Sequence, residues 1–221
     1  MRRYALKVKF KKTYSFNDPR TTNAPERLAQ GEHPGLGDER ARRRIALGEP
    51  YRTLIGHLRH ESGHFYWDQL VRDGGRLDDF RQMFGDERQD YAAALEAHYA
   101  KGNDGNDWAD HHVSAYAAAH PWEDWAETWA HYLLMVDALS EPDESRNEAA
   151  TAPASSKLAG DLVRDTEFPD LLGTWLQRAH HGNALNRALG LPDAYPFVID
   201  DGVRTKLGFI HELVREKACA R

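Results

Sequence analysis

The spacing of hydrophobic residues changes from strand-like near the N-terminus to helical over most of the chain. Leu6, Val8 and Phe10 alternate with lysines, a pattern typical of a strand with one buried face. Residues 17–37 contain Pro, Gly, Asn and Thr without periodicity, which favours a loop. We therefore expect a small N-terminal sheet at most.

Helical spacing predicts a series of helices after this segment. Their ranges are residues 38–47, 51–72, 77–84, 88–99, 108–119, 121–139, 158–163, 171–189 and 201–216. Residues 140–156 are rich in Glu, Ser, Ala and Pro, and we expect an exposed, mobile loop there. With neither an internal repeat nor a domain boundary, the pattern predicts one mainly α domain over residues 1–221.

Apolar residues at helical spacing predict the buried faces of these helices. The helix of residues 51–72 is opened by Pro50 and ended by Asp73-Gly74-Gly75, and its apolar residues are Leu54, Leu58, Phe65 and Leu70. In later helices the core candidates are Trp122, Trp125, Trp129, Ala130, Leu133, Leu134, Leu171, Leu172, Trp175, Leu176, Leu185 and Leu189. Packing is the favoured role of the first three tryptophans, and substrate contact is the alternative.

Composition and charge narrow the class of protein. Hydrophobic residues make up 41% and charged residues 29%, as in an ordinary globular protein. No apolar run approaches the roughly 18 residues of a membrane span, and the basic N-terminus lacks the apolar segment of a signal peptide. The net charge of −6 argues against nucleic-acid binding, and the single Cys219 excludes a disulfide framework. We expect a cytoplasmic protein without membrane or nucleic-acid partners.

The chemistry of the chain centres on His60-Glu61-Ser62-Gly63-His64, an H-E-x-x-H sequence within a predicted helix. Its two histidines are four residues apart and project from one helical face, so they can bind the same metal ion. Glu61 between them can reach a water on that ion. Gly63 costs the helix roughly 1 kcal/mol relative to alanine, which is easier to explain if another segment approaches closely.

A catalytic zinc site needs a third protein ligand and one open position for water. The metzincin pattern would place a histidine at position 70, which is Leu70, so that subclass is excluded. A later helix offers Glu123 as ligand and, one turn on, Glu127 as a carboxylate that supports a ligating histidine. Ala126 is small enough to let the two helices meet.

Other readings of these residues stay open at this point. Glu123 and Glu127 can also form a solvated acidic stripe in which Glu127 pairs with His131, and Asp124 is a weaker candidate for the third ligand. The reserve candidates for ligand or transition-state roles are His111, His112, His120 and His131, and His57, one turn before His60, is a residue that could line the site.

These motifs resemble the bacterial putative zinc-binding metallopeptidase family, of the glutamate-zincin type. The matching stretches are residues 46–54, 60–68, 84–88, 114–133, 185–187 and 190–193, and the resemblance covers residues 42–214. It implies an α+β zincin-like fold, one Zn²⁺, Glu123 as third ligand and Glu127 as the supporting acid. It also implies that Tyr116 stabilises the oxyanion. Residues 1–37 depart from the family, because the chain has too few cysteines for an N-terminal zinc ribbon.

The expected function is a zinc metallopeptidase acting on a peptide or protein, with Glu61 as the general base for a zinc-activated water. Two alternatives remain. One is a zinc-dependent hydrolase of a non-peptide amide, and the other is a non-catalytic, zinc-braced protein-interaction module. The presence of Glu61 favours an enzyme, because a purely structural site needs no base. Zincins hold extended substrates on an edge strand, and residues 6–10 are the candidate for that role.

Overall fold

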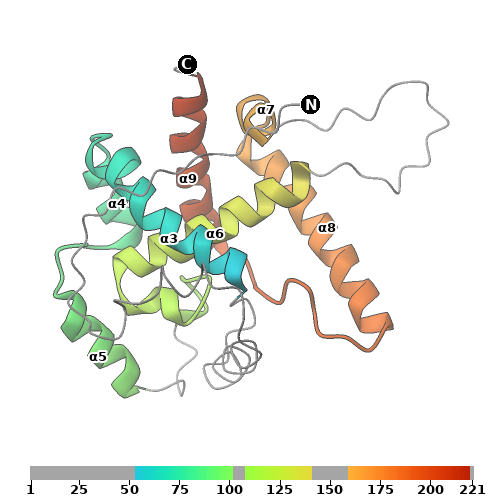
Figure 1. The fold of residues 1–221 in the computed structure, drawn as a ribbon, viewed down its shortest axis with the longest axis horizontal. Helices are drawn as coiled ribbons and strands as arrows, with labels where there is room; N and C mark the ends of the chain where they lie inside the picture. Colours follow the sequence, from blue (N-terminus) through green and yellow to red (C-terminus); the bar gives the residue numbers. More distant parts are fainter. Residues whose placement is uncertain (1–52, 102–107, 141–158, 220–221) are drawn as a thin grey trace, which may run out of the picture. The chain divides into compact units, whose positions relative to one another are not determined.

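The structure is a computed structural model that describes residues 53–101, 108–140 and 159–219. All of these belong to the second of two compact units, Arg44–Arg221. The helices are α3 (Leu54–Trp67), α4 (Leu77–Phe84), α5 (Tyr91–Lys101), α6 (Pro121–Ser140), α7 (Ala159–Asp165), α8 (Phe168–Ala188) and α9 (Asp201–Cys219), shown in Figure 1. A π-helical turn, η1 (Asp68–Arg72), and a 3-10 turn, η3 (Tyr116–Ala119), complete them.

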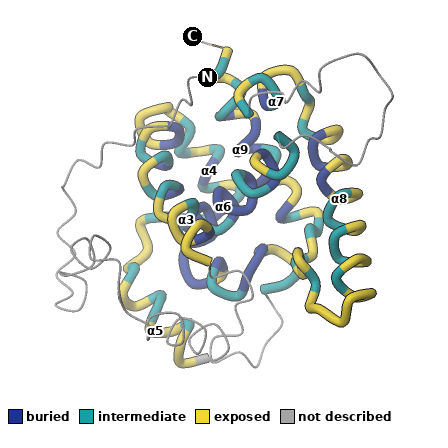
Figure 2. Tube along the Cα trace, turned by 45° about the vertical axis from the view of Figure 1, so that its right-hand side comes forward, coloured by how far each residue is buried: buried dark blue, intermediate teal, exposed yellow. Residues whose placement is uncertain are grey.

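Helix α6 is the core of the described unit. Its tube is mostly buried in Figure 2, and it contacts α3, α4, α7, α8, α9 and η3. Trp125 and Met135 are fully buried, and Trp129 is nearly so. Trp122, Leu133 and Leu134 pack against this core, which confirms the apolar face predicted for the helix.

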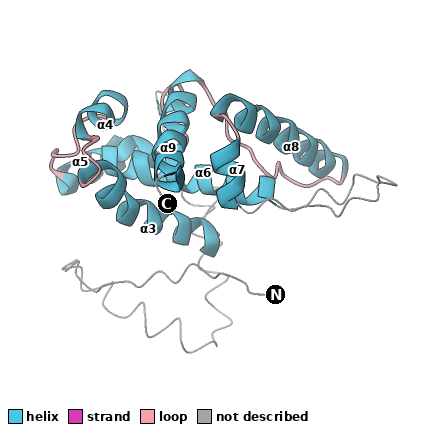
Figure 3. Cartoon of the chain, turned by 90° about the horizontal axis from the view of Figure 1, so that it is seen from above, coloured by secondary structure: helices cyan, strands magenta, loops and turns pink. Residues whose placement is uncertain are grey.

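The described residues contain helices and loops but no strand (Figure 3). This confirms the mainly α prediction. The strand predicted at residues 6–10, the helix predicted at 38–47 and Pro50 lie outside the described ranges. So does the loop predicted at 140–156, apart from Ser140, where α6 ends. Within the described part of the chain, none of the helices is both long and apolar enough to cross a bilayer.

The buried face of α3 is not the one that its apolar residues predict. Leu54, Leu58 and Phe65 are 50%, 52% and 40% exposed, and of the predicted set only Leu70, on η1, is buried. The buried residues of α3 are Gly56, Gly63 and Trp67. Small residues let α3 approach α6 closely, and α6 supplies the large aromatic side chains of the contact. The prediction from apolar spacing was therefore wrong for this helix.

Local capping explains where α3 and its extension begin and end. Thr53 Oγ1 accepts a hydrogen bond from the backbone N–H of Gly56 at 3.0 Å, so the helix begins at Leu54 rather than at residue 51. The helical backbone continues through η1 to Arg72, the predicted last residue. Gly75, with φ of +72°, then turns the chain, as the Asp73-Gly74-Gly75 stop predicted.

Two other sequence predictions need correction. Residues 108–119 form short turns instead of one helix, because the Ser114 hydroxyl accepts from the Ala117 N–H and holds η3 as a separate turn. On α8, Leu171, Leu172 and Trp175 are buried as predicted. The remaining predicted core residues of this segment, Leu176, Leu185 and Leu189, are instead 41%, 62% and 65% exposed. The core ends where α8 extends past its neighbours.

Candidate metal centre

Helices α3 and α6 meet at Gly63. A Cβ atom added to Gly63 would lie 3.0 Å from the Cα of Ala126 and 3.2 Å from the Cβ of Trp129. The indole N–H of Trp125 donates to the Gly63 carbonyl at 2.9 Å, and that of Trp129 donates to Ser62 Oγ at 3.0 Å. The expectation that Gly63 and Ala126 allow a close helix contact is confirmed.

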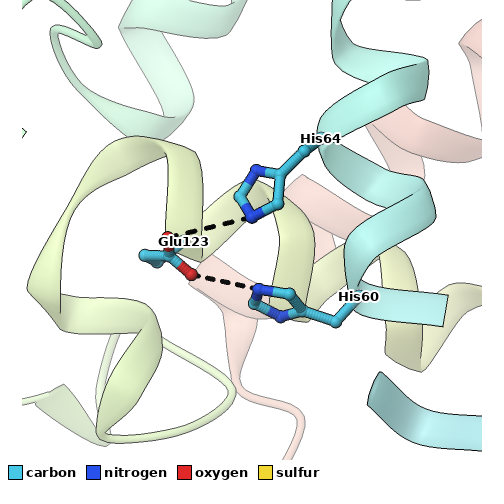
Figure 4. A group of neighbouring side chains, drawn as sticks. All are labelled: His60, His64 and Glu123. Atoms are coloured by element: carbon cyan, nitrogen blue, oxygen red, sulfur yellow. Dashed lines mark ion pairs between the residues drawn. The ribbon is translucent and has the colours of Figure 1, made fainter. Parts of the chain in front are cut away.

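This contact brings His60, His64 and Glu123 together, as Figure 4 shows. Nε2 of His60 lies 3.1 Å from Glu123 Oε2, and Nε2 of His64 lies 3.8 Å from Glu123 Oε1. One ligand atom from each residue lies within 4.8 Å of the others. Atoms that share one tetrahedral zinc ion at about 2.0–2.1 Å stand about 3.3 Å apart. The three side chains therefore have the spacing that a single zinc ion requires.

The hydrogen bonds of the two glutamates distinguish a ligand from a supporting carboxylate. Each oxygen of Glu127 accepts a hydrogen bond, Oε1 from His60 Nδ1 at 2.7 Å and Oε2 from Ser114 Oγ at 2.9 Å. Glu123 Oε1 accepts from the Tyr91 hydroxyl at 2.7 Å. Its Oε2 is buried and lies 3.1 Å from Nε2 of His60, without a well-aligned hydrogen bond among the described residues. A buried carboxylate with one imidazole nitrogen beside each of its oxygens fits a cation.

The charge of the site is concentrated on one histidine and two carboxylates. Burial lowers the pKa of His60, but Glu123 and Glu127 outweigh burial and raise that pKa to about 10. Burial raises the pKa of Glu123, but His60 and His64 outweigh it and bring the pKa down to about 2. The pKa of His64 is lowered, chiefly by burial. Without a metal, a proton on His60 therefore compensates the carboxylates.

Glu61 lies beside this cluster on the exposed side of α3. Its side chain is 48% exposed, and its Oε1 lies 3.7 Å from Nε2 of His57, one helical turn earlier. His57 is itself 61% exposed and does not belong to the cluster of possible ligands. Glu61, the residue after His60 in the sequence, is thus accessible from solvent.

Two tyrosines approach the cluster from α5 and η3. The ring of Tyr116 lies 6.1 Å from that of His60, and its hydroxyl is hydrogen-bonded to Tyr91. The hydroxyl of Tyr91 in turn reaches Glu123. Sequence reasoning identified Tyr116 but missed Tyr91 and Ser114. No spacing rule could find them, because their contacts with Glu123 and Glu127 join different elements.

The reserve candidates have other partners. Asp124 is buried and accepts a hydrogen bond from Lys206 Nζ at 2.6 Å, while His112 lies 3.7 Å from the same carboxylate. Burial raises the pKa of Asp124 to about 7 against the opposing effect of Lys206. His120 accepts from the N–H of Trp122 at the start of α6, and His131 bonds to the hydroxyl of Tyr195. None of them joins the possible ligand group within the described residues.

The fold and the site together define a helical protein with a cluster of two histidines and one carboxylate that could hold a metal ion. The chain matches the family model "Putative zinc-binding metallo-peptidase" over residues 35–213, and it belongs to that family. Uncharacterised proteins of Mycobacterium tuberculosis and Mycobacterium bovis are 38% identical to it over 207 residues. These matches cover 89% of this chain but only 59% of each mycobacterial protein. No solved structure matches the chain significantly.

Proposed function

We propose that this chain is a zinc-dependent metallopeptidase that hydrolyses peptide bonds in a peptide or protein substrate. The observation that carries the proposal is the buried carboxylate of Glu123, whose Oε2 lies 3.1 Å from Nε2 of His60 and whose Oε1 lies 3.8 Å from Nε2 of His64. Family membership supports the same conclusion. One zinc ion would be held by His60, His64 and Glu123. A catalytic zinc site has three protein ligands and one open position, and this set supplies three.

The residues around the ligands have distinct roles in this proposal. A zinc ion bound there supplies a Lewis acid and lowers the pKa of water toward about 7. Glu61 accepts the proton of the attacking water as general base and then delivers it to the leaving amine. Glu127 accepts the Nδ1 proton of His60, so that the Nε2 lone pair points at the metal position. Tyr116 would donate a hydrogen bond to the oxyanion in exchange for the one that it makes with Tyr91.

Two kinds of measurement test the proposal. Metal analysis of the purified protein should find about one zinc per chain, lost in both His60→Ala and Glu123→Ala. The Glu61→Gln variant should keep its zinc and lose hydrolysis, while Glu96→Gln, at an exposed position of α5, should behave like the parent. Cleavage by Glu61→Gln at the parental rate would refute the mechanism.

The same variants separate the alternatives. A hydrolase of a non-peptide amide would use the same residues, so profiling against mixed peptide and non-peptide amide libraries distinguishes it from a peptidase. In a non-catalytic zinc-braced module, chelation would lower thermal stability and Glu61→Gln would change nothing. The solvent-exposed position of Glu61 beside the cluster favours the enzyme.

A further inference from the structure

The hydroxyl of Tyr91 is hydrogen-bonded to one oxygen of Glu123, the carboxylate that faces the two histidines. It donates to Glu123 Oε1 at 2.7 Å, and a carboxylate can only accept, so the direction of this bond is unambiguous. Oε1 is also 3.8 Å from Nε2 of His64, close enough to share a metal ion with that histidine. The hydroxyl of Tyr91 and a metal ion would therefore compete for Oε1.

Tyr91 is held rigidly relative to Glu123. It is the first residue of α5, which Asp90 caps by accepting from the N–H of Ala93 at 3.0 Å. Its ring packs edge-to-face on the ring of His120 at 5.2 Å. The position of the hydroxyl is therefore determined by the packing of the ring as well as by its hydrogen bond.

His120 connects the segment before α5 to the first turn of α6. Its Nδ1 accepts from the N–H of Trp122 at 3.1 Å, so Nε2 carries the proton and donates to the carbonyl of Gln89 at 3.2 Å. Trp122 is the residue directly before Glu123. The buried imidazole of His120 thus joins the backbone just before Tyr91, the donor, to the backbone just before Glu123, the acceptor.

Tyr116 acts on the same hydroxyl. Tyr91 has a single hydroxyl proton, which it gives to Glu123, so it accepts the proton of Tyr116 in their mutual hydrogen bond. The order of the hydrogen bonds is Tyr116 to Tyr91 to Glu123 Oε1, whereas Oε2 lies 3.1 Å from Nε2 of His60.

We propose that Tyr91 is a positioning residue that holds Glu123 Oε1 away from the metal, so that Glu123 binds zinc through Oε2 alone. One-oxygen binding keeps the protein ligands at three and leaves a position for water. This inference rests on the zinc site of the proposed function but not on peptide hydrolysis. It assigns a role to a residue 32 positions away from Glu123 along the chain.

The test compares Tyr91→Phe with Tyr132→Phe in the full chain. Tyr132 lies on α6, the helix of Glu123, and its buried hydroxyl is hydrogen-bonded to Nδ1 of His211 at 3.1 Å, away from the cluster. Both variants lose a hydrogen-bonded tyrosine hydroxyl and keep the ring. Zinc dissociation constants are measured by competition with a chromophoric chelator, and Co²⁺ absorption spectra report the coordination number.

Tyr91→Phe is expected to weaken zinc binding about 10–100-fold, the usual effect of losing a partner of a metal ligand. Tyr132→Phe should bind zinc like the parent, and Tyr116→Phe should lose less affinity than Tyr91→Phe. The visible Co²⁺ bands of Tyr91→Phe should weaken, because a second oxygen from Glu123 raises the coordination number above four.

Parental zinc affinity in Tyr91→Phe would overturn the inference. So would a lowered affinity with unchanged Co²⁺ bands, because that result would give Tyr91 a structural role only. If the parent protein itself binds no zinc, the proposed function fails and the inference fails with it. The two failures are therefore distinguishable.

Discussion

Gly63 and Ala126 are in near backbone contact across α3 and α6: a Cβ on Gly63 would lie 3.0 Å from the Cα of Ala126. This contact brings the histidines of α3 against Glu123 of α6. Because the nearest atom belongs to the backbone, it cannot move aside as a flexible side chain would.

Gly63→Ala is therefore expected to destabilise the metal-free protein by about 1–3 kcal/mol through overpacking, less the roughly 1 kcal/mol that alanine contributes to helix propensity. Zinc affinity should fall as well, since the helices must separate. Gly173→Ala on α8, where an added Cβ has no neighbour within 4 Å, should stabilise instead. Urea unfolding measures the stability of Gly63→Ala and Gly173→Ala. Equal stability of the two variants would contradict the close contact at Gly63.

The hydrogen bond between Glu127 and His60 leads to a second prediction. Glu127 accepts from both His60 and Ser114, so Glu127→Gln removes the charge that orients the imidazole. Zinc affinity should fall about 10–100-fold, and Ser114→Ala should cause a smaller loss. Asp137→Asn breaks an exposed ion pair with Arg59 between the same helices and should leave the zinc dissociation constant unchanged. A zinc titration in which Glu127→Gln matched Asp137→Asn would remove Glu127 from the site.

Zinc binding should release about one proton near neutral pH. The pKa of His60 is raised to about 10 in the metal-free protein, so its Nε2 is protonated at pH 7.5 and must lose that proton to bind zinc. Zinc affinity should rise about tenfold per pH unit between about pH 7 and 8.5. Calorimetry in buffers of different ionisation enthalpy measures the proton count, and a binding heat independent of the buffer would contradict it.

The raised pKa of His60 also predicts how the stability of the metal-free protein changes with pH. Because the folded pKa of His60 lies above its unfolded value of 6.5, its stabilising contribution is complete below about pH 6.5 and is lost as the pH rises through about 10. The metal-free protein should lose this contribution over that interval. His60→Gln should show a smaller decrease in unfolding free energy over the same range.

A buried ion pair behind the site provides the last prediction. Lys206 on α9 donates to Asp124 and to the His111 carbonyl, each at 2.6 Å, and so ties α9 to α6 and to the segment before η3. Lys206→Met would leave both acceptors without this donor and should destabilise the protein by about 3–5 kcal/mol. Arg204→Met, at an exposed position of the same helix, should change stability by less than about 1 kcal/mol. Thermal unfolding that did not separate the two would contradict a buried pair.

Much of the site follows from relations within single helices. The spacing of His60 and His64 places both imidazoles on one face in any helix, and Glu123 and Glu127 are one turn apart for the same reason. The range of α4 was predicted to the residue, and α6 within one residue, because their start and stop signals lie in adjacent sequence. Local geometry needs no partner, so sequence alone was sufficient for these features.

Contacts between helices required the tertiary structure. The apolar spacing of Leu54, Leu58 and Phe65 pointed to a buried face that is in fact exposed, because α3 meets α6 at Gly63. The hydrogen bonds of Tyr91 and Ser114 to the two glutamates depend on how α5 and the turn before η3 pack against α6. Sequence determined which residues could bind a metal. Helix packing decided which group lies beside each oxygen of Glu123, because these groups come from elements that only the fold brings within hydrogen-bonding distance.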